Sequence, residues 1–203
     1  SICIKLIDVY NSNYININAE NVFPLLIEKY FNTIWPIISE AMLMEDKYWF
    51  CYQIKGEIGS GMGFGAGKLF TCGHDEEIKN FCKKNPKKAP AVIAELIPCY
   101  RYENTNNESR EVTGFSDWFC WLLDEFGEDK LVRSSLYGNL GSFSWSGSII
   151  PYYDRNIMCF NQLLKHSRPE VIEWAKCAIK GYEEERAAEE ERENYMKIHY
   201  ELG

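Results

Sequence analysis

Apolar residues recur every three or four positions through most of this chain, which is the spacing of one face of an α-helix. From Asn21 onward the pattern predicts amphipathic helices joined by short connections rich in Gly, Pro, Asn or Ser. The predicted helices cover residues 21–30, 35–43, 75–84, 87–96, 116–126, 129–137, 151–166 and 167 onward. The second half shows no convincing alternation of apolar and polar residues, which is the pattern of a half-buried strand.

Single residues predict several helix boundaries. Pro36 fits only the first turn of its helix, where no amide hydrogen is needed. Ser116 is a good N-terminal cap for the helix that follows it, and Gly127 is a good end for that helix. The run 167–170 combines a capping Ser, a first-turn Pro and an acidic residue at the capping-box position.

The same spacing predicts which side chains face inward. Leu25 and Tyr30 share a face of the first helix, and Leu131 joins Leu136 on another. The inner stripe predicted for the last helix is Val171, Trp174, Ala175, Ala178, Ile179 and Tyr182. The run 183–193 is rich in Glu and Arg and therefore indicates a solvated helix with Glu–Arg pairs.

Serial amphipathic helices predict a mainly α fold, an α-α superhelix of the HEAT-like type, because stacked helix pairs bury each other's apolar faces. The repeat period is irregular, which favours HEAT-like units over a strict consensus repeat. We expect an N-terminal extension or truncated element at 1–20, a helical-repeat domain at 21–185 and a charged helical tail at 186–203. A short irregular or β segment is left open near the N-terminus. The start lacks Met and lies in an apolar run, so we expect a segment of a longer protein.

The net charge of the chain indicates which classes of partner to expect. The net charge of −8 disfavours nucleic acid as a default partner. Lys83, Lys84, Lys87 and Lys88 are the best candidate for a local basic patch, and we interpret them as a solvated helix junction. The eight cysteines are scattered without a disulfide framework, which indicates a reducing, cytoplasmic compartment. No apolar run reaches the roughly 18 residues of a membrane span, and no signal peptide is evident.

The glycine-rich run 56–68 invites comparison with a phosphate-binding loop. Lys68 is followed by Leu69 where Ser or Thr would hold magnesium, and Met62 stands where the first Gly belongs. A connecting loop is therefore the better interpretation. A nucleotide- or thiol-dependent enzyme built around 56–82 stays an alternative.

Metal and thiol chemistry have weak support. Cys72, His74 and Cys82 lack the short Cys-x-x-Cys element of structural zinc sites. A Cys–His dyad would need a thiolate beside an oriented histidine, and His166 is explained by its place at a helix end. The sequence therefore predicts no catalytic residue, cofactor or metal, and a protein that is not an enzyme.

The loop 138–148 carries aromatics, glycines and several hydroxyls, and two interpretations stay open. Trp145 could dock between helix pairs while the serines cap the next helix, or the loop could anchor a partner. The candidate partner-binding residues are Phe143, Trp145, Ser146, Ser148 and Tyr152.

Five runs carry a resemblance: 81–90, 93–98, 142–148, 151–153 and 171–175. Together they resemble the C-terminal helical-repeat regions of large bacterial multidomain proteins, including STAND-type NTPases and other proteins of phage defence. The resemblance covers roughly residues 20–195. It implies a cytoplasmic α-solenoid that senses or scaffolds while another part of the parent chain carries the enzymatic activity.

The predicted function is therefore a non-catalytic protein-interaction, sensing or scaffolding module. Its expected partner is another protein or other domains of a parent chain, with neither nucleic acid nor membrane. The alternatives are a small acidic inhibitor of the immunity or antitoxin type, which would mask a basic toxin, and the enzyme described above.

Overall fold

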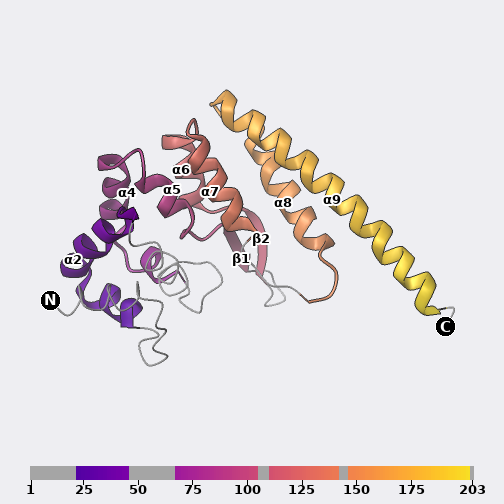
Figure 1. Cartoon of the computed structure of the whole chain (residues 1–203), viewed down its shortest axis with the longest axis horizontal. Coiled ribbons are helices and arrows are strands. Elements are labelled where there is room, and N and C mark those ends of the chain that lie inside the picture. The colour runs from indigo at the N-terminus through magenta and orange to yellow at the C-terminus, as the bar shows by residue number, and fades with distance from the viewer. Residues whose placement is uncertain (1–21, 46–66, 105–109, 142–145, 202–203) are drawn as a thin grey trace. The chain divides into compact units, whose positions relative to one another are not determined.

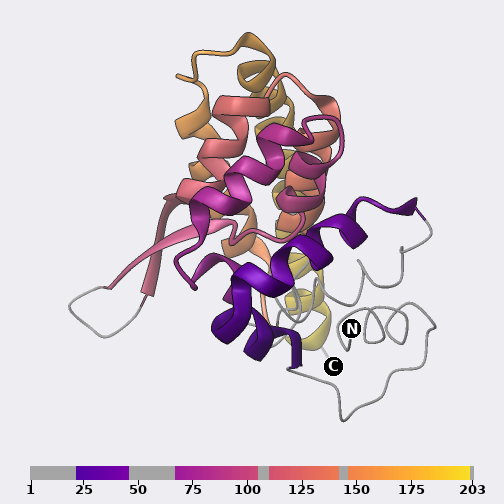
Figure 2. The same ribbon diagram turned by 90° about the vertical axis from the view of Figure 1, so that its left-hand side faces the viewer.

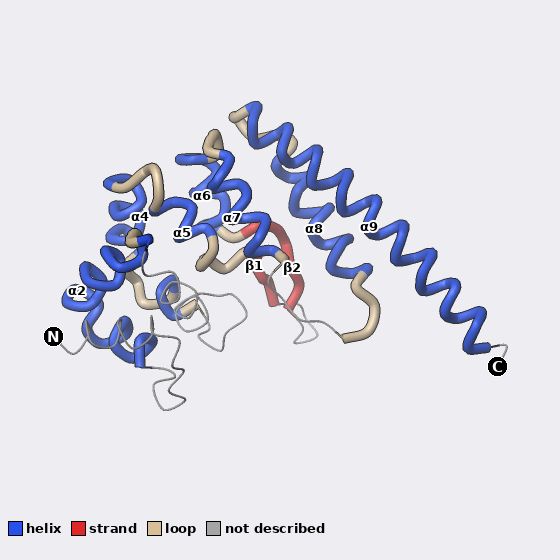
Figure 3. Tube along the Cα trace, in the orientation of Figure 1, coloured by secondary structure: helices blue, strands red, loops and turns tan. Residues whose placement is uncertain are grey.

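The computed structural model describes residues 22–45, 67–104, 110–141 and 146–201. These residues form α-helices, a short 3-10 helix and a two-stranded antiparallel sheet, which confirms a mainly α protein (Figure 3). Contacts divide the chain into two compact units. Unit 1 comprises residues 1–99 and 117–143, and unit 2 comprises residues 100–116 and 144–203. None of the described helices is at once long enough and apolar enough to cross a membrane.

Unit 1 is a group of helices around one apolar core. Its elements are α2 (Val22–Met42), η3 (Lys68–Phe70), α4 (Asp75–Lys84), α5 (Ala89–Ala94), α6 (Asp117–Phe126) and α7 (Lys130–Leu140). The short helix α5 contacts α4, α6 and α7. Ile93 of α5, Phe119 of α6 and Leu136 of α7 are fully buried. The predicted helix at 75–84 is confirmed with both boundaries.

Helix α2 combines the two predicted helices across a kink at Tyr30, whose φ of −136° and ψ of 31° are not helical. The break comes more than one turn before Pro36, so the first-turn placement of that proline is wrong. The inward face is also corrected, because Leu25 is 54% exposed and Tyr30 is 60% exposed. Ile27 and Phe31 are buried instead. Several apolar stripes run along this segment, and spacing alone cannot tell which stripe other elements cover.

The turn between α6 and α7 is fixed by a side-chain cap. Asp129 is the N-cap of α7, and its carboxylate accepts a hydrogen bond of 2.8 Å from Leu131 N. Leu131 is 62% exposed, which corrects its predicted burial, whereas Val132 and Leu136 are buried. Leu131 lies in the first turn of α7, next to the cap, and its side chain is on the solvent side.

Asn139 ties α7 to the end of α5. Its side chain is buried, and Nδ2 donates hydrogen bonds of 3.0 Å to Ala94 O and 2.9 Å to Ile97 O. The last carbonyls of any helix lack intrahelical partners. Asn139 lies far from α5 in the sequence, and its amide supplies the hydrogen-bond donors that these carbonyls lack within their own segment.

Unit 2 joins a β-hairpin to a helical hairpin. Its elements are β1 (Tyr100–Asn104), β2 (Arg110–Phe115), α8 (Ile150–Leu163) and α9 (Pro169–Glu201). The strands lie side by side (Figure 2) and pair antiparallel, with an irregularity between Arg101 and Tyr102. The sequence predicted no strands in this region, so the hairpin corrects that expectation.

The hairpin forms because β2 packs on α8. Phe115 is buried, and its ring meets that of Phe160 at 5.1 Å in an edge-to-face arrangement. Gln162 Nε2 donates a hydrogen bond of 3.0 Å to Thr113 O. A two-stranded hairpin alone is marginally stable in water. The stabilising contacts come from residues distant in sequence, which no local pattern displays.

Helices α8 and α9 form an antiparallel pair (Figure 1). Pro151 and Pro169 lie in the first turns of the two helices, as predicted. The predicted inner stripe of α9 is confirmed in its main positions, since the following residues are buried: Val171, Ala175, Ala178 and Tyr182. Trp174 packs its ring against Phe160 at 5.1 Å.

Candidate functional site

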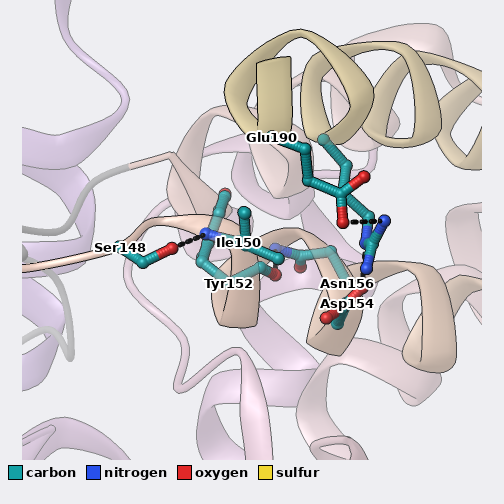
Figure 4. A network of polar contacts seen from close by, with 7 residues as sticks. Ser148, Ile150, Tyr152, Asp154, Asn156 and Glu190 are labelled. Atoms are coloured by element: carbon teal, nitrogen blue, oxygen red, sulfur yellow. Dashed lines mark hydrogen bonds and ion pairs between the residues drawn. The ribbon is translucent and has the colours of Figure 1, made fainter. Parts of the chain in front are cut away.

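The predicted partner-binding residues fall at the start of α8, and part of the set can be placed. Phe143 and Trp145 lie outside the described residues. Ser146 and Ser148 are exposed, and Ser148 Oγ accepts a hydrogen bond of 3.2 Å from Ile150 N (Figure 4). Ser148 thus contacts the first amide of α8, but the N-cap of that helix is Ile149, which has no side-chain cap, so the predicted serine cap is found only in this looser form. Partner binding by these residues stays a prediction.

Tyr152 belongs to an aromatic cluster within unit 2. It is half-buried, and its hydroxyl lies 3.4 Å from that of Tyr182 on α9. Its ring lies 5.7 Å from that of Tyr153 and 5.9 Å from that of Tyr182. Among the members of the predicted set that the structure describes, Tyr152 alone both packs in the interior and reaches the surface at the start of α8.

A polar cluster beneath these rings joins α8 to β1. Asn156 is fully buried, and its Nδ2 donates a hydrogen bond of 3.0 Å to Tyr152 O. Its Oδ1 accepts a hydrogen bond of 2.8 Å from the Tyr100 hydroxyl. The Arg155 guanidinium lies 4.5 Å from the Tyr100 ring centroid, and its Nε is buried without a hydrogen-bond partner. Cation–π contact takes the place of a counter-ion for the charge of Arg155.

Ion pairs show where the N-terminal part of α8 meets α9. Arg186 on α9 donates to Asp154 on α8 and lies 2.8 Å from Glu190 on its own helix (Figure 4). One turn further on, Arg192 binds both oxygens of Glu189. The hydrogen bond to Asp154 raises the pKa of Arg186, and those from Arg192 lower the pKa of Glu189. The predicted Glu–Arg pairs of the run 183–193 are therefore confirmed.

Helix α9 continues well past the point where α8 begins. The two helices have 33 and 14 residues, or about 50 Å and about 21 Å at 1.5 Å per residue. Because they run antiparallel and Asp154 meets Arg186, the part of α9 beyond Glu190 extends past the first turn of α8 (Figure 1). We call residues 191–201 the distal segment of α9.

Apolar side chains return on the distal segment. Tyr195 is 59% exposed, Met196 is 38% exposed and Ile198 is 59% exposed. A cluster of exposed large apolar residues is characteristic of binding surfaces, whereas single ones are ordinary. The sequence interpretation passed over these residues, because the preceding Glu-rich run was taken as the start of a solvated tail. Tyr195 and Ile198 are three residues apart, and this helical spacing of apolar residues after the Glu-rich run was the signal in the sequence.

The other chemical candidates are held in structural roles. Cys82 is fully buried, and burial raises the pKa of its thiol to about 12. Burial also raises the pKa of Cys72, whose Sγ donates to Leu69 O. His74 stacks on Phe31 with ring centroids 3.9 Å apart. Within the described part of the chain, no three His, Cys, Asp or Glu side chains gather as a metal site would require.

The glycine-rich run and the lysine cluster have simpler surroundings. Residues 56–66 lie outside the described part of the chain, and Lys68 forms an ion pair of 3.4 Å with Glu28. The four lysines lie at the junction of α4 and α5, where Lys88 lies 3.2 Å from a Glu45 oxygen. The contact of Lys88 agrees with a solvated junction, whereas the connecting loop predicted at 56–66 lies outside the described residues.

Comparison of the chain with protein-family models, curated proteins and solved structures finds no match. The resemblance to helical-repeat regions therefore stays an expectation, and the functional argument depends on the surfaces described above.

Proposed function

We propose that this chain is a non-catalytic protein-interaction module that binds its partner at the open end of the α8–α9 hairpin. The observation that carries the proposal is the exposure of Tyr195, Met196 and Ile198 on a helical segment that extends past its packing partner. A helix with exposed apolar side chains is a common peptide- and helix-binding element.

The surroundings of this segment favour recognition. Tyr152 and the exposed Ser146 and Ser148 lie at the start of α8, and the Tyr152–Tyr182 and Asp154–Arg186 contacts hold that start against α9. The ion pairs of Arg186 with Glu190 and of Arg192 with Glu189 favour helical structure in this part of α9. A preformed surface loses less conformational entropy on binding than a mobile one.

A HEAT-like superhelix within a larger bacterial protein belongs to the same proposal. The packing of α5 against α4, α6 and α7 is the arrangement that supports it. The partner would then be another domain of the parent chain or a separate protein. The second candidate, an acidic inhibitor of a basic protein, is favoured by the net charge of −8.

Photo-crosslinking tests the proposal. A photoreactive residue replaces Ile198 in one variant and Leu25 in a matched control, since Leu25 is similarly exposed but lies on α2. We expect a crosslinked partner from position 198 that is reduced by excess unmodified chain and by Tyr195→Ser. Equal capture from position 25, or capture unaffected by the excess chain, would contradict the proposal. Circular dichroism verifies that each variant folds.

A further inference from the structure

We infer that Arg155 of α8 binds a carboxylate group, which an acidic side chain of the partner protein presents to it. The source of the carboxylate rests on the proposed interaction function, whereas the site itself is formed by residues of unit 2 alone. The Arg155 guanidinium has no counter-ion, two tyrosine rings hold it in place, and the acidic side chains nearby are engaged on another side of α8.

The positive charge of Arg155 has no hydrogen-bond or ion-pair partner among the residues that the structure describes. Its side chain is half-buried, and Nε is the one buried side-chain nitrogen or oxygen of the described residues that lacks a hydrogen-bond partner. Such a group in a folded protein calls for an explanation, because nearly all buried polar atoms are paired. The two terminal nitrogens are not buried in this way, so they can receive a partner from outside the chain.

Two tyrosine rings fix the position of this guanidinium. Its carbon Cζ lies 4.5 Å from the ring centroid of Tyr100 and 5.4 Å from that of Tyr152. The fully buried Asn156 holds both tyrosines, because it accepts a hydrogen bond of 2.8 Å from the Tyr100 hydroxyl and donates one of 3.0 Å to Tyr152 O. A side chain that is already held in place loses little conformational entropy when a ligand binds. The two rings therefore make Arg155 a preformed site for an anion.

The acidic side chains around this part of α8 lie on its α9 side. Asp154 pairs with Arg186, and burial together with the charge of Glu185 raises the pKa of the Tyr153 hydroxyl. Arg155 lies against β1 instead, because successive residues of a helix point about 100° apart. The acidic run of α9 therefore meets another side of α8 and leaves the charge of Arg155 uncompensated.

A single guanidinium selects a carboxylate over a phosphate. The cluster of Arg155, Tyr100, Tyr152 and Asn156 holds one positive charge, which balances one carboxylate, whereas phosphate groups on proteins are ordinarily recognised by clusters of arginine. A carboxylate is planar and accepts two parallel hydrogen bonds from a guanidinium. Because Nε is buried, we expect both bonds to come from the terminal nitrogens.

The surroundings of Arg155 suit a side chain of a protein. Tyr102 of β1 is 52% exposed, and its ring lies 6.4 Å from that of Tyr100. Aromatic rings beside the guanidinium can pack on the methylene groups that carry the carboxylate of Asp or Glu. Arginine and tyrosine are also among the residue types that contribute most to binding energy at protein interfaces. An Asp or Glu of the partner would supply the counter-ion that no described residue gives to Arg155.

Anion titrations of the whole chain, followed by NMR, test the site directly. Sodium acetate supplies a carboxylate, and sodium chloride at the same ionic strength is the matched control. We expect the Arg155 Nε–Hε signal to shift with acetate along a saturable curve and to stay nearly in place with chloride. The amide signals of residues 152–156 should follow the same curve.

Matched variants separate recognition by the guanidinium from simple charge attraction. Arg155→Lys keeps the charge but loses the paired donors, so it should weaken acetate binding by about three- to tenfold, measured on the amide signals. Arg155→Gln should abolish the saturable shift. Arg110→Gln removes an exposed arginine at the start of β2 and should leave acetate binding unchanged. Circular dichroism verifies that each variant folds.

Several results would overturn the inference. Equal shifts with acetate and chloride would indicate charge screening alone, and tighter binding of inorganic phosphate than of acetate would contradict the choice of a carboxylate. A large shift of the Arg155 signal on Glu103→Gln, without acetate, would identify Glu103 as its counter-ion.

The crosslinking experiment separates this inference from the proposed function. Partner capture at position 198 that is unchanged by Arg155→Gln and by Arg155→Lys would overturn the inference and leave the proposed function standing. Saturable acetate binding without any captured partner would contradict the proposed function and leave Arg155 as a site for a free carboxylate.

Discussion

Asn139 offers a sharp test of how unit 1 is held together. It is a buried polar residue whose amide donates to two main-chain carbonyls of another segment, Ala94 O and Ile97 O. Both of these acceptor residues are fully buried. Replacing Asn139 by Ala would leave two carbonyls without their donor in a place that is closed to solvent.

The expected cost follows from the number of groups affected. A typical hydrogen bond contributes about 1 kcal/mol net, and each buried group left unsatisfied costs about 1–3 kcal/mol. Some relaxation and water entry reduce the sum, so we expect Asn139→Ala to lower the free energy of unfolding by about 2–4 kcal/mol. For a chain of this length, that corresponds to a melting temperature about 5–15 °C lower.

Urea unfolding followed by tryptophan fluorescence and by circular dichroism measures the effect. The matched control is Asn161→Ala, because Asn161 is exposed and its Nδ2 donates within its own helix to Ile157 O. The control should change stability by no more than about 0.5 kcal/mol. Asn139→Asp keeps the shape but replaces the donor by an acceptor, and it should cost at least as much as Asn139→Ala. Equal, small effects of the changes at Asn139 and Asn161 would refute the reasoning.

Substitutions at two further residues test local energetics in unit 1. Burial raises the pKa of the Cys82 thiol from an ordinary 9.0 to about 12. The unfolded chain therefore loses this proton at a lower pH than the folded protein does. The contribution of the neutral thiol to the free energy of unfolding is complete below pH 9 and is lost as the pH rises toward 12. Between pH 9 and 11 the free energy of unfolding should fall by about 1.4 kcal/mol per pH unit because of Cys82, and Cys82→Ala should reduce this slope in urea titrations. An unchanged slope would show that Cys82 is not the group responsible. Asp129→Ala removes the cap of α7 and should cost about 1 kcal/mol, whereas Asp129→Asn, which keeps an acceptor, should cost little. Similar thermal melts for both Asp129 variants would show that the cap contributes nothing.

Local signals predicted the helices whose boundaries depend on nearby residues. Helix α4 has an apolar period with Asp75 at its start and Lys84 at its end, and α9 starts at the predicted proline. These elements are decided by hydrogen bonds and charges within a few residues, which one sequence displays. The β1–β2 hairpin was missed because its strands are stabilised by Phe160 and Gln162 of α8, far away in the sequence.

Some properties of the candidate site could likewise be predicted from the sequence, and others could not. The sequence by itself determined that α9 is a long acidic helix with Glu–Arg pairs, because these properties arise from spacing along one segment. Only the tertiary structure decided which apolar residues stay uncovered. Tyr182 is buried and Ile198 is exposed on the same helix, because α8 is shorter than α9 and its Asp154, near its start, already meets Arg186. Burial depends on where a neighbouring element ends, and that position is a property of packing between segments.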